Sequence, residues 1–355
     1  MTPKVIPSLT GLRGIAAILV VMFHVELGTR LHLFDAGYLG VDAFFMLSGF
    51  VLAHVYADKF SKWNARTYIA FLKARVARIY PLHLFMLCVV AAAIMFIPGL
   101  RSSYPDADQR FGLSCFAASA LLIQNWFHWM PGCWNTPSWS LSAEWFAYLV
   151  FPVLVFATQR ARKPMTSILL AGLCLLGLTV VLFLKRVPSM SLEGGPGMVR
   201  MAAEFCCGCF IYRAIKSGLK TAPVVMDIVA VIGLCASIVA GNDFLCLFAI
   251  GLIVLLAAQE RGPVARVLAA QWAVFLGEIS YSVYLVHWIV LQVTNRTAES
   301  MKLEGAAFAL WDLGVIALIV AISTVSYRFV EIPARAFGRK VGVRSATALA
   351  NTDAI

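Results

Sequence analysis

The sequence predicts an all-α integral membrane protein with about ten transmembrane helices and one re-entrant or interfacial helix. Of its 355 residues, 61% are hydrophobic and only 13% are charged, whereas an ordinary soluble domain is about 25% charged. The apolar residues gather in runs of about 20, the length that crosses a bilayer core about 30 Å thick. We therefore expect one polytopic membrane domain over residues 1–340 and a short, disordered cytoplasmic tail over residues 341–355.

The candidate spans follow one another with short connections, and Pro, Gly or charged residues mark their ends. The first run begins after a single Lys and lacks a small-residue cleavage site, so we expect it to be a retained span and not a signal peptide. The spans are predicted at roughly 10–29, 37–56, 79–98, 138–157, 165–186, 199–215, 223–241, 243–259, 270–294 and 307–329.

Loop charge predicts how these spans are oriented, because cytoplasmic loops are enriched in Lys and Arg. The basic segments 57–80 and 158–164 should both be cytoplasmic. Since one outgoing and one returning span lie between them, the further apolar run at 112–127 must not cross the membrane. We expect it to be a re-entrant or interfacial helix on the outer side, and both chain termini to be cytoplasmic. The formal net charge of +11 has the same topological explanation, although an anionic partner would also fit.

Cysteine usage gives no sign of a metal centre. The nine Cys have no CxxC spacing, and most are expected to be packing residues in apolar helices. Cys115 and Cys133 flank the proposed re-entrant stretch and could form a disulfide, although pairing cannot be read from sequence. Walker A, zinc and GxSxG patterns are also absent from the sequence.

Three ionisable residues lie at a similar depth in different predicted spans. With a rise of about 1.5 Å per residue, His24 lies roughly 20 Å from the inner end of its span, and Asp42 and Glu144 lie roughly 8 and 9 Å below the outer ends of theirs. Such groups are costly in a membrane and indicate function unless they pair structurally. We predict that His24 is a general base steadied by Glu144 and Asp42. Asp42 could instead cap its helix.

Two other residues of the outer half have structural explanations. His287 has aromatic neighbours, Tyr284 and Trp288, that are also typical of packing at a membrane interface. Glu204 could pair with Arg200 at i, i+4. We do not assign either residue to the predicted site.

Arginines gather at the opposite, inner ends of the spans. Arg75 and Arg78 are three residues apart and share a helix face, and Arg13 lies at the same level. Arg328 and Glu331 lie there at the end of the last span. Guanidinium groups bind phosphate bidentately, so the cluster predicts an anionic donor that binds from the cytoplasm. Each arginine could also simply follow the positive-inside rule.

Six motifs in this order resemble the membrane-bound acyltransferase family 3, the multi-span O-acyltransferases of bacterial surface glycans and related molecules. The first motif has an Arg, ten residues and a His, and together the six extend over nearly the whole chain. They read LTGLRGIAAILVVMFH, GYLGVDAFFMLSGFVL, RVARIYP, PSWSLSAEWFAYLVFP, ISYSVYLVHW and YRFVEIPAR.

The resemblance implies acyl-CoA, usually acetyl-CoA, as a co-substrate bound from the cytoplasmic side, and a sugar hydroxyl as the commonest acceptor. It also implies that His24 is the catalytic histidine, that Arg13 belongs to the same motif, and that Arg75 and Arg78 are the basic pair for the CoA phosphates. Glu144 matches the acidic residue of the Trp-rich helix. Compared with longer relatives of that family, we expect no appended esterase-like hydrolase domain.

We therefore predict an acyl-CoA-dependent O-acyltransferase in a bacterial cytoplasmic membrane, with no metal, no permanently bound cofactor and no nucleic-acid partner. The acceptor would be a carbohydrate at or beyond the outer face, although a lipid-linked sugar or a small metabolite would also fit. Two alternatives stay open. One is a proton-coupled transporter that uses His24, Asp42 and Glu144 as a relay, and the other is a non-catalytic membrane scaffold.

Overall fold

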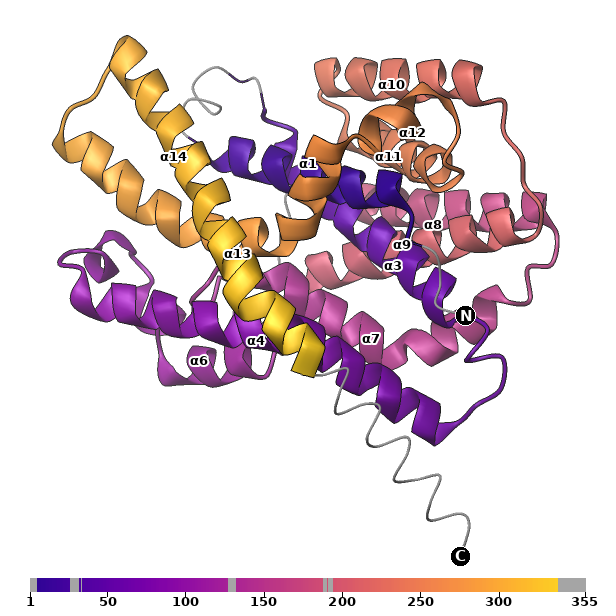
Figure 1. Cartoon of the computed structure of the whole chain (residues 1–355), viewed down its shortest axis with the longest axis horizontal. Helices are drawn as coiled ribbons and strands as arrows, with labels where there is room; N and C mark the ends of the chain where they lie inside the picture. Colours follow the sequence, from indigo (N-terminus) through magenta and orange to yellow (C-terminus); the bar gives the residue numbers. More distant parts are fainter. Residues whose placement is uncertain are drawn as a thin grey trace, which may run out of the picture.

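Helices form the described part of the chain, and no strand occurs there (Figure 1). The computed structural model describes residues 5–25, 32, 34–126, 132–187, 190 and 194–337. Its α-helices are α1 (Pro7–His24), α3 (Gly40–Tyr56), α4 (Ala65–Phe96), α5 (Ala107–Arg110), α6 (Leu113–Ala120), α7 (Ser138–Thr158), α8 (Pro164–Leu184), α9 (Gly194–Lys216), α10 (Pro223–Val239), α11 (Asp243–Ala258), α12 (Gly262–Leu268), α13 (Gln271–Ser300) and α14 (Gly305–Ser326). Single turns precede α3 (η1, Gly37–Leu39) and α5 (η2, Arg101–Ser103), and a π-helical turn follows α14 (η3, Tyr327–Glu331).

Local sequence signals explain where several helices begin. Pro occupies the first turn of α1, α8, α10 and α12, where its missing N–H would have no helical partner in any case. Asn64 and Asn242 are N-caps, and their side chains accept hydrogen bonds from the backbone N–H of Thr67 and Leu245 at 3.1 Å. These caps start α4 and α11 at fixed residues.

The structure supports a multi-pass membrane protein but does not confirm all ten predicted spans. Seven helices of the described chain are long and apolar enough to cross a membrane, and α11 with α12, bent by 81°, makes an eighth candidate. The predicted span 199–215 lies in α9, whose charged and glycine residues lower its hydropathy. The predicted span 223–241 lies in α10, whose apolar part is only Val224–Val239. The cytoplasmic position of the termini stays a prediction.

The run at 112–127 contains α6, which has only eight residues. A helix of that length rises about 12 Å and is too short to cross a bilayer. A disulfide between Cys115 and Cys133, with Cα atoms 5.4 Å apart, joins α6 to the segment before α7. The tail 341–355 lies outside the described residues.

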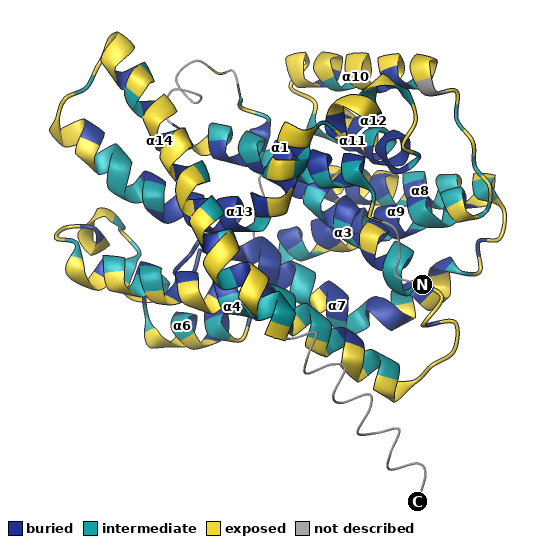
Figure 2. Ribbon diagram, in the orientation of Figure 1, coloured by how far each residue is buried: buried dark blue, intermediate teal, exposed yellow. Residues whose placement is uncertain are grey.

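Burial separates a central group of helices from a lipid-like periphery. In Figure 2, α1, α3 and α9 are largely buried, whereas α10 and α14 are mostly exposed. The exposed side chains of these outer helices are large and apolar, as Ile232 and Leu310 illustrate. Such a surface is typical of helices that face lipid. The inner helices pair as α1 with α13 and α3 with α9.

Glycines bring the backbones of these two helix pairs into direct contact. A Cβ atom at Gly277 of α13 would lie 1.9 Å from the Thr10 carbonyl oxygen of α1, and one at Gly14 would lie 2.5 Å from the Gly277 nitrogen. In the other pair, a Cβ at Gly49 or at Gly208 would lie 2.0 Å from a backbone oxygen of the partner helix. Small residues allow membrane helices to approach this closely.

A buried ion pair also joins α3 to α9. Arg200 donates from Nε to Asp42 Oδ1 at 2.8 Å and from Nη2 to Asp42 Oδ2. Glu204 lies near the same nitrogen, with Oε1 3.7 Å from Arg200 Nε, as the i, i+4 spacing suggested. The exposed fractions of Asp42, Arg200 and Glu204 are 0%, 1% and 0%. The carboxylate of Asp42 therefore contacts Arg200 and not His24.

We expect Gly277→Ala to lower the free energy of unfolding by roughly 1–3 kcal/mol, because α1 and α13 must separate to admit the methyl group. Gly172→Ala in α8 is the matched control, since a Cβ atom there would point into open space, and alanine should be neutral or stabilising by about 1 kcal/mol. Thermal unfolding in detergent measures both. Equal stability of the two variants would contradict the close-contact interpretation.

We expect Asp42→Asn to destabilise the protein by about 3–5 kcal/mol, because it leaves Arg200 buried without its bidentate partner. The control is Asp108→Asn, which removes an exposed partner of Arg101 and should cost about 1 kcal/mol or less. The yield and thermal stability of purified protein give the comparison. If Asp42→Asn folds as well as the control, the pair does not hold α3 against α9.

Candidate functional site

Two cavities lie one after the other along helices α1, α3, α7 and α13. The arginine cavity is the one that contains three of the predicted arginines and Glu144, and it also touches α4. The histidine cavity is the one that contains His24 and His287, and it also touches η1 and α9. Both cavities are thus enclosed by helices distant in sequence that the glycine contacts bring together.

The arginine cavity gathers side chains from five helices. Its lining residues are Arg13, Phe44, Phe45, Leu47, Ser48, Val51, Leu52, Arg75, Arg78, Ile79, Ser140, Leu141, Glu144, Tyr148, Ser280, Tyr281 and Tyr284. Polar groups are mixed with apolar walls, as is typical of ligand sites. The three arginines predicted to form one cluster therefore do so.

Each arginine of this cavity is held by a different kind of contact. Arg13 donates to Ser280 Oγ at 3.2 Å. Arg75 donates to the Tyr56 hydroxyl at 3.2 Å, and its Cζ lies 5.4 Å from the centre of that ring, within range of a cation–π interaction. Its buried Nε has no hydrogen-bond partner among the described residues. Arg78 lies within electrostatic range of Arg13, Arg75 and Arg335.

Glu144 belongs to the arginine cavity. It accepts a hydrogen bond from Ser48 and lies within electrostatic range of Arg13 and Tyr148. Along α7, Trp139 lines the histidine cavity whereas Glu144 lines the arginine cavity. Five residues of helix correspond to about 7.5 Å of rise. Equal predicted depth thus did not bring Glu144 to His24.

A second carboxylate, which is buried, lies near the same arginines. Glu331 accepts hydrogen bonds from Ser282 and from Arg335, and it lies within electrostatic range of Arg13. From the sequence we grouped Glu331 with Arg328, but the i, i+4 neighbour Arg335 is the one that contacts it. The π-helical turn η3 includes Glu331 and shifts the helical register here.

The histidine cavity is smaller and rich in aromatic side chains. Its lining residues are Val20, Phe23, His24, Tyr38, Val41, Thr136, Pro137, Trp139, Arg200, Tyr284, His287 and Trp288. The His24 side chain is exposed to this space, whereas His287 is fully buried. Their ring centres are 5.2 Å apart. The structure therefore brings His287, which the sequence alone does not assign to the site, beside His24.

Backbone carbonyls orient both imidazoles. His24 Nδ1 lies 2.8 Å from the Val20 oxygen, four residues earlier in α1. This contact assigns the proton to Nδ1, because a carbonyl can only accept, and leaves Nε2 as an acceptor. His287 Nδ1 lies 3.2 Å from the Val283 oxygen, and its Nε2 has no hydrogen-bond partner in the described part of the chain. Neither imidazole depends on a carboxylate for its orientation.

Tyr284 lies between the two cavities and lines both of them. On sequence grounds it was only an aromatic neighbour of His287. The signal was present in the spacing, because Ser280, Tyr284 and His287 are separated by four and three residues and so share one face of α13. The sequence did not show how that face of α13 packs against α1 and α7.

No metal site is evident in the described residues, where His, Cys, Asp and Glu do not gather in groups of three or more able to hold an ion. Among the polar groups that line the two cavities, those with the most distinctive chemistry are the arginines of one and the imidazoles of the other. The first suit an anion, and the second suit proton transfer.

Comparison with known proteins identifies the family. The family model described as "Acyltransferase domain" matches residues 6–328. The acyltransferase MdmB of Streptomyces mycarofaciens is 29% identical over 391 residues, which cover 98% of this chain and 96% of that protein. The O-acetyltransferase OatA of Staphylococcus aureus is 25% identical over 370 residues, covering 96% of this chain. The peptidoglycan O-acetyltransferase OatA of Listeria monocytogenes is also 25% identical, over 94% of this chain.

The relatives differ in length. This chain spans 58% of the Staphylococcus aureus protein and 56% of the Listeria monocytogenes protein. No solved structure matches the chain. Because the family model covers most of the sequence, including the helices that line both cavities, the chain belongs to the acyltransferase 3 family of membrane acyltransferases.

Proposed function

We propose that this acyltransferase moves an acetyl or similar acyl group from acyl-CoA to a hydroxyl of a carbohydrate-type acceptor, with His24 as the general base. The observation that supports this most strongly is the pair of cavities along the same helices. One gathers arginines and the other contains an accessible imidazole, and they share Tyr284 as a wall. A donor and an acceptor could thus approach one reaction centre from opposite ends.

The arginine cavity suits the phosphates of CoA. Arg13, Arg75, Arg78 and Arg335 lie near one another, and the acidic groups in electrostatic range of Arg13 are Glu144 and Glu331. Arginines therefore outnumber carboxylates, which favours an anionic ligand, and guanidinium binds phosphate oxygens bidentately. In the proposal, Arg75 and Arg78 hold the phosphates with Arg13 nearby. Glu144 keeps Arg13 in position.

The length of α1 suits the rest of the donor. Arg13 and His24 belong to one helix and are separated by about 16 Å of rise. An extended pantetheine arm can cover such a distance, so a donor held at the arginines can present its thioester close to His24. In the topology predicted from loop charge, the arginine end faces the cytoplasm, where acyl-CoA is made.

The chemistry proposed for His24 is proton abstraction. Its Nδ1 is held by the Val20 carbonyl, so Nε2 can take the proton of the acceptor hydroxyl as the oxygen attacks the thioester carbon. Breaking the C–S bond then releases CoA thiolate, which recovers the proton from the imidazolium. Asp42 takes no part in this step. Its role in the proposal is to hold Arg200 in the wall of the histidine cavity.

The acceptor is proposed to be a carbohydrate because two relatives are named O-acetyltransferases, one of peptidoglycan. Trp139 and Trp288 line the histidine cavity and offer flat apolar faces beside polar groups, as sugar rings require. A lipid-linked sugar or a small metabolite would meet the same residues. The proton-relay alternative has no support in the contacts, because Asp42 pairs with Arg200 and Glu144 lies among arginines.

We expect His24→Ala to lower kcat for acyl transfer by about 10²–10⁴-fold, the usual contribution of a general base, with little change in stability because the side chain is exposed. The control is His32→Ala, a change at another exposed histidine. Release of free CoA from acetyl-CoA in the presence of candidate glycan acceptors gives the rate. Ordinary turnover by His24→Ala would refute the assignment.

We expect Arg75→Ala and Arg78→Ala each to raise the KM for acetyl-CoA about tenfold or more, because each removes charge-assisted hydrogen bonds to phosphate. Arg266→Ala is the matched control, since its guanidinium is exposed and bonds only to Gly262 among its described contacts. Steady-state kinetics with varied acetyl-CoA separates KM from kcat. An unchanged KM in both cavity variants would mean that this pair only sets topology.

A further inference from the structure

A third cavity lies where helices α3, α7 and α9 end. Its volume is about 240 Å³, against about 110 Å³ for the arginine cavity. The candidate spans Gly37–Tyr56 and Ser138–Thr158 end beside it, so it lies at the level where these spans would leave the hydrocarbon core. We call it the basic cavity, and its lining residues are Ala57, Asp58, Ser61, Thr158, Gln159, Tyr212, Arg213 and Lys216.

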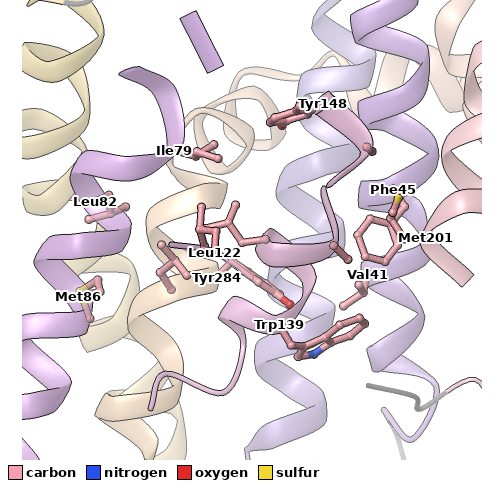
Figure 3. Packing of buried hydrophobic residues seen from close by; sticks show 14 of the residues in the cluster. Val41, Phe45, Ile79, Leu82, Met86, Leu122, Trp139, Tyr148, Met201 and Tyr284 are labelled. Carbon is pink, nitrogen blue, oxygen red and sulfur yellow. The ribbon is translucent and has the colours of Figure 1, made fainter. Parts of the chain in front are cut away.

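Hydrophobic packing separates the basic cavity from the arginine cavity. Among the described residues, none lines both. Along α7, the buried Phe151 and Val155 lie between Tyr148, which lines the arginine cavity, and Thr158, which lines the basic cavity. The ring of Phe71 stacks on Phe151 with centres 5.2 Å apart. These rings belong to the buried cluster that Figure 3 draws in part, with Tyr148 labelled. The basic cavity is therefore separate from the site already described.

The segments that meet at the basic cavity have a large excess of positive charge. Hydrogen bonds join these segments, because Gln159 Nε2 donates to the Ala57 carbonyl at 2.8 Å and Lys216 donates to Asp58. Over residues 57–64, 159–163 and 213–222, Asp58 is the one acidic residue, so the local potential favours an anion. The eight basic residues of these segments are Lys59, Lys62, Arg160, Arg162, Lys163, Arg213, Lys216 and Lys220.

Arg213 and Lys216 supply cationic hydrogen-bond donors within the basic cavity. Among the described residues, Arg213 bonds only through Nε, to the Ala161 carbonyl at 2.9 Å, so both of its Nη groups remain for a ligand. The partner of Lys216 is Asp58, whose side chain is 83% exposed. An ion pair this exposed contributes little stability, so Lys216 can exchange the carboxylate for another anion. A guanidinium fork beside an ammonium group suits a phosphate.

The surroundings of the basic cavity favour a lipid as the source of that phosphate. Val153 and Phe156 are exposed in the last two turns of α7, before Gln159, and present an apolar surface to acyl chains. Trp63 is exposed in the neighbouring segment, with its ring centre 5.5 Å from that of Tyr68, and Trp and Tyr are typical of the head-group level. Basic pockets between membrane helices bind anionic lipid head groups.

We propose that the basic cavity binds the phosphate of an anionic phospholipid, with Arg213 and Lys216 as hydrogen-bond donors and the acyl chains against α7. This inference goes beyond the proposed function and does not depend on it. Loop charge predicts this face to be cytoplasmic, so the lipid belongs to the inner leaflet. Because α3 and α7 also line the arginine and histidine cavities, the head group fastens the ends of helices that form the site.

The first test measures lipid binding to purified protein by native mass spectrometry. The wild-type protein should bind dioleoylphosphatidylglycerol about tenfold more tightly than dioleoylphosphatidylcholine, because choline carries a positive charge. Arg213→Gln combined with Lys216→Gln should weaken phosphatidylglycerol binding about tenfold or more, since it removes charge-assisted hydrogen bonds.

The matched control is Arg261→Gln combined with Arg266→Gln, which removes the same charge at two exposed arginines outside the basic cavity. It should leave the affinity nearly unchanged. If both double variants weaken binding equally, the lipid responds only to the overall charge of this face, and the proposal is wrong.

A single variant covers the case in which the double variant does not fold, because Arg213 also holds the Ala161 carbonyl. Lys216→Gln leaves that contact intact and should weaken phosphatidylglycerol binding about fivefold, the effect of one basic residue near the membrane surface. Lys220→Gln is its control, a change at an exposed lysine four residues later that does not line the cavity. Equal affinities of these two variants would overturn the proposal.

Thermal unfolding in detergent distinguishes the possible sources of the phosphate. Phosphatidylglycerol should raise the Tm of the wild-type protein by a few degrees and that of the double variant by less, because a ligand that binds only the folded state stabilises it. Sodium phosphate should have no more effect than sodium chloride of equal ionic strength. Equal stabilisation by phosphate would assign the cavity to a soluble anion, and displacement of the lipid by acetyl-CoA would assign it to the acyl donor. Either result would refute a lipid site.

Discussion

The contact between α1 and α13 at Gly14 and Gly277 is the constraint on which the site depends. Here two helix backbones lie closer than any side chain would allow. Arg13 and His24 extend from one helix, and Ser280, Tyr284 and His287 from the other. Since both helices line both cavities, their separation and relative rotation decide which of these groups can meet. Membrane helices gain no hydrophobic energy from leaving lipid, so this close packing must hold them together.

The same reasoning explains why α9 can carry charges in the middle of the molecule. Gly49 and Gly208 bring α3 and α9 together, and this approach lets Arg200 reach both oxygens of Asp42. Charges are costly away from water, and the bidentate hydrogen bonds between Arg200 and Asp42 offset part of that cost. The pair holds the Arg200 guanidinium over Trp139, with its Cζ 5.7 Å from the ring centre. Charged residues in this chain thus serve two purposes. Arg200 is matched by Asp42 and Glu204 and stabilises the contact between α3 and α9. The arginines of the arginine cavity outnumber the nearby carboxylates, which suits an anionic ligand.

The arrangement also suggests how one membrane domain can handle two different substrates. The arginine cavity is cationic and has apolar walls, which suits a molecule with phosphates at one end and a flexible arm at the other. The histidine cavity has aromatic walls and two imidazoles, which suits hydroxyl groups. Two relatives extend well beyond the matched region, whereas the residues that line both cavities all lie within residues 6–328, the range of the family model.

The sequence by itself determined the fold class, most of the helices and the family, because these depend on composition, on runs of apolar residues and on motifs within single helices. It also placed Arg13, Arg75 and Arg78 correctly in one cluster, since all three begin or flank spans at the same level. Helix rise alone could not decide the partners of His24, because depth fixes only one coordinate. The other coordinates of a side chain depend on how its helix is rotated about its own axis, and tertiary packing determines that rotation. Only the structure therefore moved Asp42 to Arg200 and Glu144 to the arginines, and placed His287 beside the imidazole of His24 and Tyr284 beside that of His287.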